Sequence, residues 1–201
     1  LLNHDCFGAA QILIGSASSK TGFGLAKMLQ DEAAIGAGVV GFTSPANAAF
    51  VHELKCCDEV VLYGNETRLD PSQPSAYVDM SGDGRLTEAV HRHFGDNLKA
   101  SIMVGATHWE HQQRPDALPG AKPEFFFAPE HVANRDREWG RGAVMLRALQ
   151  ASFRVAASIK NQLTLEWLRD AQSLQATWLD LLDNKVSARR GIMVSLPDTG
   201  S

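Results

Sequence analysis

One stretch constrains the fold of this chain more than any other: "QILIGSASSKTGFGLAKML", residues 11–29. An apolar run leads into a loop of small polar residues, and the loop leads into a segment whose apolar residues recur at helical spacing. A strand that turns tightly into a helix presents backbone amides and the positive end of the helix dipole to one place. The stretch therefore predicts a phosphate-binding turn in a protein built of strands and helices.

The rest of the chain continues this alternation. Further strands are predicted at "GVVGFTS", "DEVVLYG", "SAYVDMSG", "KASIMVGAT" and "KPEFFFAP", with helices between several of them. The alternation indicates an α/β fold with a Rossmann-type, doubly wound parallel sheet of about six strands. We expect this domain in residues 1–160, and a helical tail with one more strand, "RRGIMVSLP", in residues 161–201. That strand has no evident partner in the preceding sheet.

Composition narrows the class of protein. The chain has 201 residues, of which 44% are hydrophobic, so it can build one full core. Its net charge of −4 and pI near 6.0 argue against a nucleic-acid partner, and no apolar run is long enough for a membrane span. Its cysteines, Cys6, Cys56 and Cys57, suit a reduced, cytoplasmic protein better than a disulfide scaffold. Because it starts at Leu1, we expect the chain to be part of a longer one.

Two familiar phosphate motifs do not fit the turn. A P-loop needs glycine six residues before its lysine and another directly before it, but Ile14 and Ser19 stand there. A short-chain reductase needs a tyrosine with a lysine four residues later, which lowers the pKa of the phenol. The two tyrosines here, Tyr63 and Tyr77, have no such lysine.

A third interpretation, the turn of a medium-chain dehydrogenase, fits better. Gly22 would let the helix start close to the strand, and small residues before it would let amides approach a pyrophosphate. Lys20 adds a positive charge at the same place. The candidate residues of this turn are Ser16, Ser18, Ser19, Lys20, Thr21 and Gly22.

Several stretches carry a closer resemblance: "SASSKTGFGLA", "GFTSPANAAFV", "VDMSG", "VGATHWE" and "PEFFFAPEHVANR". Together they resemble the cofactor-binding, C-terminal half of the zinc-free, quinone-reductase-like medium-chain dehydrogenase/reductase superfamily, in a branch known only as a domain of unknown function. The resemblance implies a Rossmann fold and a nicotinamide cofactor. It also implies a separate β domain outside this chain, to which the last strand would belong, and a homodimer through the Phe125–Phe127 strand.

The end of the second strand bears on the choice of cofactor. An NAD site usually has a carboxylate there, but this chain has Thr43 and Ser44, which favours NADP. The alternative is that these residues only cap a helix that begins at Pro45. Gly105, Ala106 and Thr107 are expected to line the nicotinamide end. We expect no metal, although His108 and His111 follow closely.

The sequence thus predicts an NADP(H)-binding oxidoreductase that transfers hydride to or from a carbonyl or activated alkene of a small-molecule substrate. It names no catalytic acid or base. The alternative is a non-catalytic nucleotide-binding or interaction module. Three smaller expectations remain: Asp79 bonds local backbone, His91 and His93 lie on a solvated helix face, and all three phenylalanines of "EFFFAP" lie in one strand.

Overall fold

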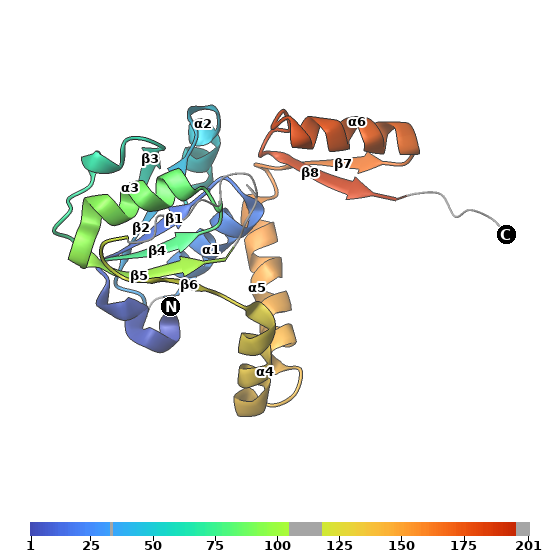
Figure 1. Cartoon of the computed structure of the whole chain (residues 1–201). Coiled ribbons are helices and arrows are strands. Elements are labelled where there is room, and N and C mark those ends of the chain that lie inside the picture. Colours follow the sequence, from blue (N-terminus) through green and yellow to red (C-terminus); the bar gives the residue numbers. More distant parts are fainter. Residues whose placement is uncertain (33, 105–117, 196–201) are drawn as a thin grey trace.

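The computed structural model describes residues 1–32, 34–104 and 118–195. Its main feature is a parallel sheet of six strands in the order β3-β2-β1-β4-β5-β6 (Figure 1). This confirms the predicted Rossmann-type fold. The strands are β1 (Gln11–Gly15), β2 (Gly38–Thr43), β3 (Glu59–Leu62), β4 (Ser75–Asp79), β5 (Leu98–Met103) and β6 (Pro123–Phe125).

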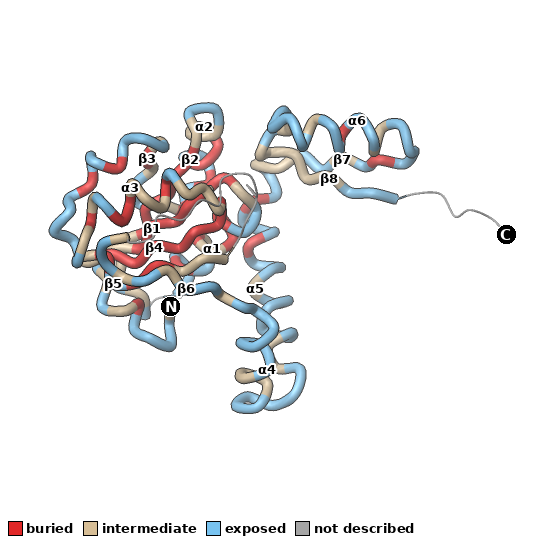
Figure 2. The backbone as a smooth tube through the Cα atoms, in the orientation of Figure 1, coloured by how far each residue is buried: buried red, intermediate tan, exposed pale blue. Residues whose placement is uncertain are grey.

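Helices cover both faces of this sheet. Neighbouring residues of β1 point to opposite faces, so they pack against different helices. Ile12 and Ile14 pack in a cluster with residues of α1, α2 and α5, whereas Leu13 packs with residues of α3. All three side chains are fully buried, and Figure 2 shows the buried residues concentrated in these central strands. The helices are α1 (Lys20–Asp31), α2 (Pro45–Leu54), α3 (Gly84–Phe94), α4 (Ala128–Trp139) and α5 (Ala143–Ile159), with 3-10 turns at Leu2–Gly8, Glu66–Arg68 and Gly95–Asn97.

The order of the strands fixes where a ligand can bind. β1 pairs with β2 on one side and with β4 on the other, all parallel. The chain moves outward in opposite directions on the two sides of β1, so the connections leave a crevice at the carboxyl end of this strand. The turn that the sequence singles out, residues 16–19, lies at that end.

The end of the chain forms a small unit of its own, to one side of the main sheet (Figure 1). This C-terminal unit consists of β7 (Thr164–Leu168), α6 (Ala171–Leu182) and β8 (Arg190–Val194). As expected, β8 has no partner in the six-stranded sheet, but it pairs in parallel with β7, so the expectation that its partners all lie outside this chain is wrong. The prediction of helix is also wrong over residues 164–168, where β7 pairs with β8. The predicted division of the chain at residue 160 stays a prediction.

The edge strand is shorter than predicted. β6 contains only Phe125 of the three consecutive phenylalanines, so the expectation of three in one strand is wrong. Phe126 donates its amide to the carbonyl of Met103 and stacks on His131, with ring centres 4.5 Å apart. Phe127 precedes α4 at its N-cap. β6 nevertheless lies at the edge of the sheet, where a strand of another molecule could pair with it.

Two histidines of α3 also depart from expectation, because neither is simply solvated. His91 is fully buried, and its ring nitrogens bond the carbonyl of Pro119 at 2.8 Å and the hydroxyl of Ser101 at 2.9 Å. His93 is half-buried and bonds the carbonyl of Leu69. Polar partners on other elements satisfy these rings, and the helical pattern of α3 does not reveal such partners.

Candidate functional site

The turn between β1 and α1 is held by its own serines. Ser19 is the N-cap of α1: its hydroxyl accepts the amide of Gly22 at 3.0 Å and donates to the carbonyl of Ser16 at 2.8 Å. Ser16 has a φ of +59°, a left-handed conformation that residues other than glycine rarely adopt. The amide of Ala17 donates to the carbonyl of Phe42, which ties the turn to β2. The turn is therefore a defined structure before any ligand arrives.

Gly22 occupies the position that the sequence assigns to it. A Cβ at this residue would collide with the carbonyl oxygen of Ser16, and it would lie 2.9 Å from the Ser19 hydroxyl and 3.1 Å from Ala17 Cα. The prediction that Gly22 has no room for a side chain is thus confirmed. Its close approach brings the first turn of α1 against the loop, where amides near the helix start have no acceptor within the helix. Such amides are suited to an anion.

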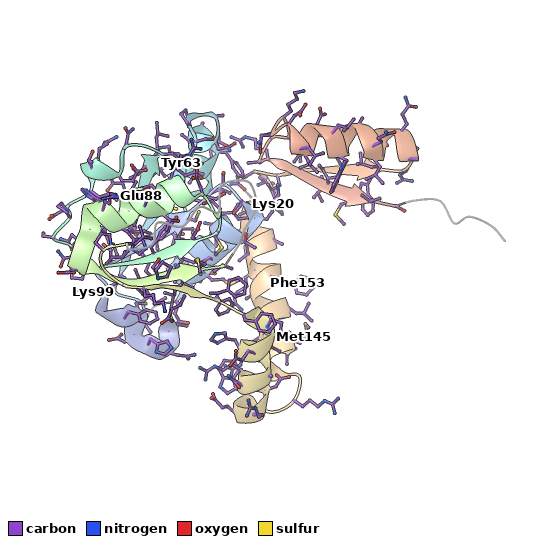
Figure 3. The ribbon with its side chains drawn as sticks, viewed as in Figure 1. Lys20, Tyr63, Glu88, Lys99, Met145 and Phe153 are labelled. Atoms are coloured by element: carbon purple, nitrogen blue, oxygen red, sulfur yellow. The ribbon has the colours of Figure 1, made fainter. Side chains whose placement is uncertain are left out.

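Lys20 lies in this first turn, but its side chain has other partners. Its ammonium donates to the carbonyls of Ala188 at 2.9 Å and Arg190 at 2.7 Å. Arg190 is the first residue of β8, and Ala188 lies just before it. Figure 3 labels Lys20. Partial burial lowers the pKa of Lys20. The structure therefore places Lys20 at the turn, as predicted, with its charge directed to peptide oxygens.

At the end of β2, one hydroxyl is buried without a partner. Thr43 is fully buried, and its Oγ1 has no hydrogen-bond partner among the described residues. Ser44 stands at the N-cap of α2 and Pro45 begins that helix, but the Ser44 side chain forms no capping bond. The capping interpretation therefore accounts for the position of these residues and not for their hydroxyls. A buried hydroxyl without a partner is costly, so a ligand group beside Thr43 would be stabilised.

Tyr63 is a site residue that the sequence reasoning missed. It follows β3 directly (Figure 3), its amide donates to the carbonyl of Thr43, and its phenol lies near Ser16 in the turn. Although Tyr63 is 38% exposed, partial burial raises the pKa of its phenol. Ser16 opposes this rise, and the negative charges of Asp83 and Asp79 add to it. The phenol is therefore protonated at neutral pH. Its place at the end of a strand two positions from β1 is the signal that could have identified it.

Asp79 ends β4 on the other side of β1. Its Oδ1 accepts the amides of Ser81 and Gly82 and the Ser81 hydroxyl at 2.8–3.0 Å. The prediction that Asp79 bonds local backbone is confirmed. Tyr77, two residues earlier on β4, is fully buried, and burial and the charge of Asp79 raise the pKa of its phenol. Asp79 therefore supports the floor of the crevice, whereas the buried Tyr77 hydroxyl has no hydrogen-bond partner among the described residues.

The predicted nicotinamide-lining residues Gly105, Ala106 and Thr107 lie outside the described residues, as do His108 and His111. Within the ranges that the structure describes, no group of three histidine, cysteine or acidic side chains could hold a metal ion. None of the helices described is long and apolar enough to cross a membrane. The site on view is therefore the half of the crevice formed by β1, β2, β3 and β4.

Comparison with known proteins places this geometry in context. A family model described as "Protein of unknown function (DUF2855)" matches residues 2–187. This confirms the prediction that the chain matches a family of unknown function. No curated protein matches the sequence.

Several solved structures share the fold. The yhdH oxidoreductase from Salmonella enterica in complex with NADP has a TM-score of 0.58 at 12% identity, covering 93% of this chain and 55% of that one. E. coli K-12 YhdH with bound NADPH has a TM-score of 0.52 at 13% identity, covering 91% and 54%. Bacillus subtilis protein yhfP with NAD bound has a TM-score of 0.52 at 18% identity, covering 93% and 54%. The chain therefore spans about half the length of these structures, and at such identities the likeness shows the fold alone.

Proposed function

This chain belongs to the protein family described as "Protein of unknown function (DUF2855)", and on that premise we propose that it binds a nicotinamide dinucleotide, with NADP(H) preferred. The observation that carries the proposal is the turn between β1 and α1. It is closed by Gly22, it lies at the crevice of a Rossmann-type sheet, and it directs the start of a helix to one place. Structures of the same fold hold NADP, NADPH or NAD, which supports this cofactor class.

The preference for NADP(H) rests on the end of β2. No carboxylate stands at Thr43 or Ser44 to bond a ribose 2′-hydroxyl and repel a 2′-phosphate. The unpartnered Thr43 hydroxyl and the Tyr63 phenol, which are tied together through the Thr43 backbone, offer hydrogen-bonding groups instead. Thr43, Ser44 and Tyr63 are thus the residues that we assign to the adenosine ribose and its phosphate.

The proposed activity is hydride transfer to or from a carbonyl or activated alkene of a small molecule. When bound, the cofactor supplies the hydride, and the protein binds and orients it. In this chain, the turn at residues 16–22 would hold the pyrophosphate. Ser19 and Gly22 would keep the backbone amides of the turn in position. The alternative of a nucleotide-binding module without turnover shares every one of these contacts.

Ligand titration tests the proposal. The melting temperature of the protein should rise with NADPH more than with an equal concentration of NADH, and ATP with magnesium should leave it unchanged. A ligand at 100 times its Kd stabilises a protein by about 2.7 kcal/mol, which is readily measured. An unchanged melting temperature with both dinucleotides would refute the cofactor assignment, and a larger shift with NADH would refute the preference. A second assay separates the enzyme from the module: quinones or enones are added to the protein with NADPH, and the loss of NADPH absorbance is followed. Oxidation faster than without protein indicates an enzyme, and an unchanged rate indicates a module without turnover.

A further inference from the structure

The segment Ala188–Arg190 fastens the C-terminal unit to the candidate site. Lys20 donates to the carbonyls of Ala188 and Arg190, as described above. The side chain of Arg189 forms an ion pair with Glu53 of α2 at 2.6 Å, and its guanidinium lies 5.0 Å from the centre of the Phe50 ring. The start of α1 and one side of α2 therefore hold the same three residues.

Lys20 contacts a particular edge of the small sheet. The carbonyl of Arg189 accepts the amide of Thr164 at 2.9 Å, within the pairing of β7 and β8. β8 begins at Arg190, and successive carbonyls of a strand point to opposite sides, so the carbonyl of Arg190 faces away from β7, toward the open edge of β8. Ala188 lies in the turn directly before β8. Lys20 therefore donates to the open edge of β8 at Arg190 and to the turn before it at Ala188. A sheet of two strands has little stability of its own, so these bonds contribute to holding it in place.

A bound dinucleotide would make a second demand on the same ammonium. Lys20 is the first residue of α1, directly after the N-cap Ser19, and the proposed pyrophosphate lies at this helix start. A bond from an ammonium to a phosphate is charge-assisted on both sides, whereas its bond to a peptide carbonyl is charge-assisted on one side only. The phosphate is therefore the stronger acceptor.

We propose that Lys20 is a latch that responds to the cofactor: the phosphates of a bound dinucleotide draw its ammonium away from the carbonyls of Ala188 and Arg190 and loosen the C-terminal unit. This inference rests on the proposed function, because it requires the dinucleotide at the turn. It also gives β7, α6 and β8 a role, since their attachment reports whether the crevice is occupied. Arg189 keeps its contacts to α2, so the unit loosens without detaching.

Hydrogen–deuterium exchange of the full chain, read by mass spectrometry, tests the latch. NADPH should slow exchange in peptides covering 16–24 and speed it by about three- to tenfold in peptides covering 186–194. Without ligand, Lys20→Met should already speed exchange in 186–194 by a similar factor, and NADPH should add nothing further. A tenfold change corresponds to about 1.4 kcal/mol, and the partial exposure of Lys20 argues for the lower part of this range. Lys27→Met, on the same helix, is the matched control and should exchange in 186–194 as the unmutated protein does.

The two proposals fail in different ways. Slower exchange in 16–24 with unchanged or slower exchange in 186–194 would leave the cofactor site standing and overturn the latch. Unchanged exchange in 16–24 at saturating NADPH would refute the cofactor site, and with it a latch that answers to the cofactor. Equal exchange in 186–194 for Lys20→Met and Lys27→Met would show that the bonds from Lys20 do not hold the unit, which also overturns the latch.

Discussion

Replacing Gly22 with alanine is expected to destabilise the turn and to weaken NADPH binding together. The added Cβ would collide with the Ser16 carbonyl oxygen and press on the Ser19 hydroxyl and Ala17 Cα. Two of these three neighbours are backbone atoms, which cannot rotate away as the end of a side chain can. Either the start of α1 or the turn itself must shift.

The size of the effect follows from two opposing terms. Alanine is about 1 kcal/mol more favourable than glycine inside a helix, so a substitution without collision would stabilise the protein. Forcing an extra carbon into a filled site costs about 1–3 kcal/mol. Gly24→Ala isolates the first term, because a Cβ at this glycine of the same helix meets no atom within 4 Å. Gly22→Ala should therefore be less stable than Gly24→Ala by the collision term, about 1–3 kcal/mol.

Urea unfolding followed by circular dichroism measures this difference, and thermal melts should show it as about 2–4 °C for each kcal/mol in a chain of this size. Isothermal titration should show NADPH affinity lowered about tenfold or more in Gly22→Ala, since about 1.4 kcal/mol of lost contact has that effect, and unchanged in Gly24→Ala. If Gly22→Ala matched Gly24→Ala in both stability and affinity, the collision would not occur and the turn would not be the one described here.

Three further predictions concern other parts of the molecule. Thr43→Val should leave the free protein as stable or more stable by about 1 kcal/mol, because it removes a buried hydroxyl without a partner, but should weaken NADPH; unchanged affinity in titrations would exclude Thr43 from the site. Burial lowers the pKa of His91. Below about pH 6.5 the unfolded chain therefore binds a proton at this residue more readily than the folded chain does, and stability falls as pH falls. Urea unfolding at pH 7.5 and 5.5 should show a smaller decline in unfolding free energy for His91→Gln than for the unmutated protein. We propose a homodimer through the open edge of β6. Phe125 is 65% exposed, so Phe125→Lys should give monomers in light scattering, whereas Phe153→Lys on α5 should leave the dimer intact. A monomeric unmutated protein would contradict edge pairing.

The sheet and its turn could be predicted from sequence because their signals are local. Each central strand is an apolar run, since both of its faces are covered, and its neighbours in the chain are recognisable helices. Gly22 could be predicted as well, because the close approach of helix and loop excludes any other residue. β7 could have been recognised too: Asp170 after it caps α6 by accepting the amide of Ser173, a sign that a new helix starts there.

Contacts between distant segments could not be predicted in this way. The partners of His91 are Ser101 on β5 and Pro119 in a loop, and both depend on how helix and sheet are packed. Tyr63 lies near Ser16 only because β3 and β1 lie on either side of β2. Helical and strand periodicity show which face of an element is apolar, but not which polar group of another element lies opposite a buried polar side chain.

Lys20 shows how far a local argument extends. A positive charge at the start of a helix lies at the positive end of the helix dipole, which is unfavourable, so this residue needs an electronegative partner. The sequence therefore correctly predicts a need, and phosphate is one group that meets it. In the structure, two carbonyls more than 160 residues away in the chain meet the same need. Because one ammonium cannot fully satisfy both, the identity of its partner must depend on what occupies the crevice, and exchange in residues 186–194 is where that dependence should be measurable.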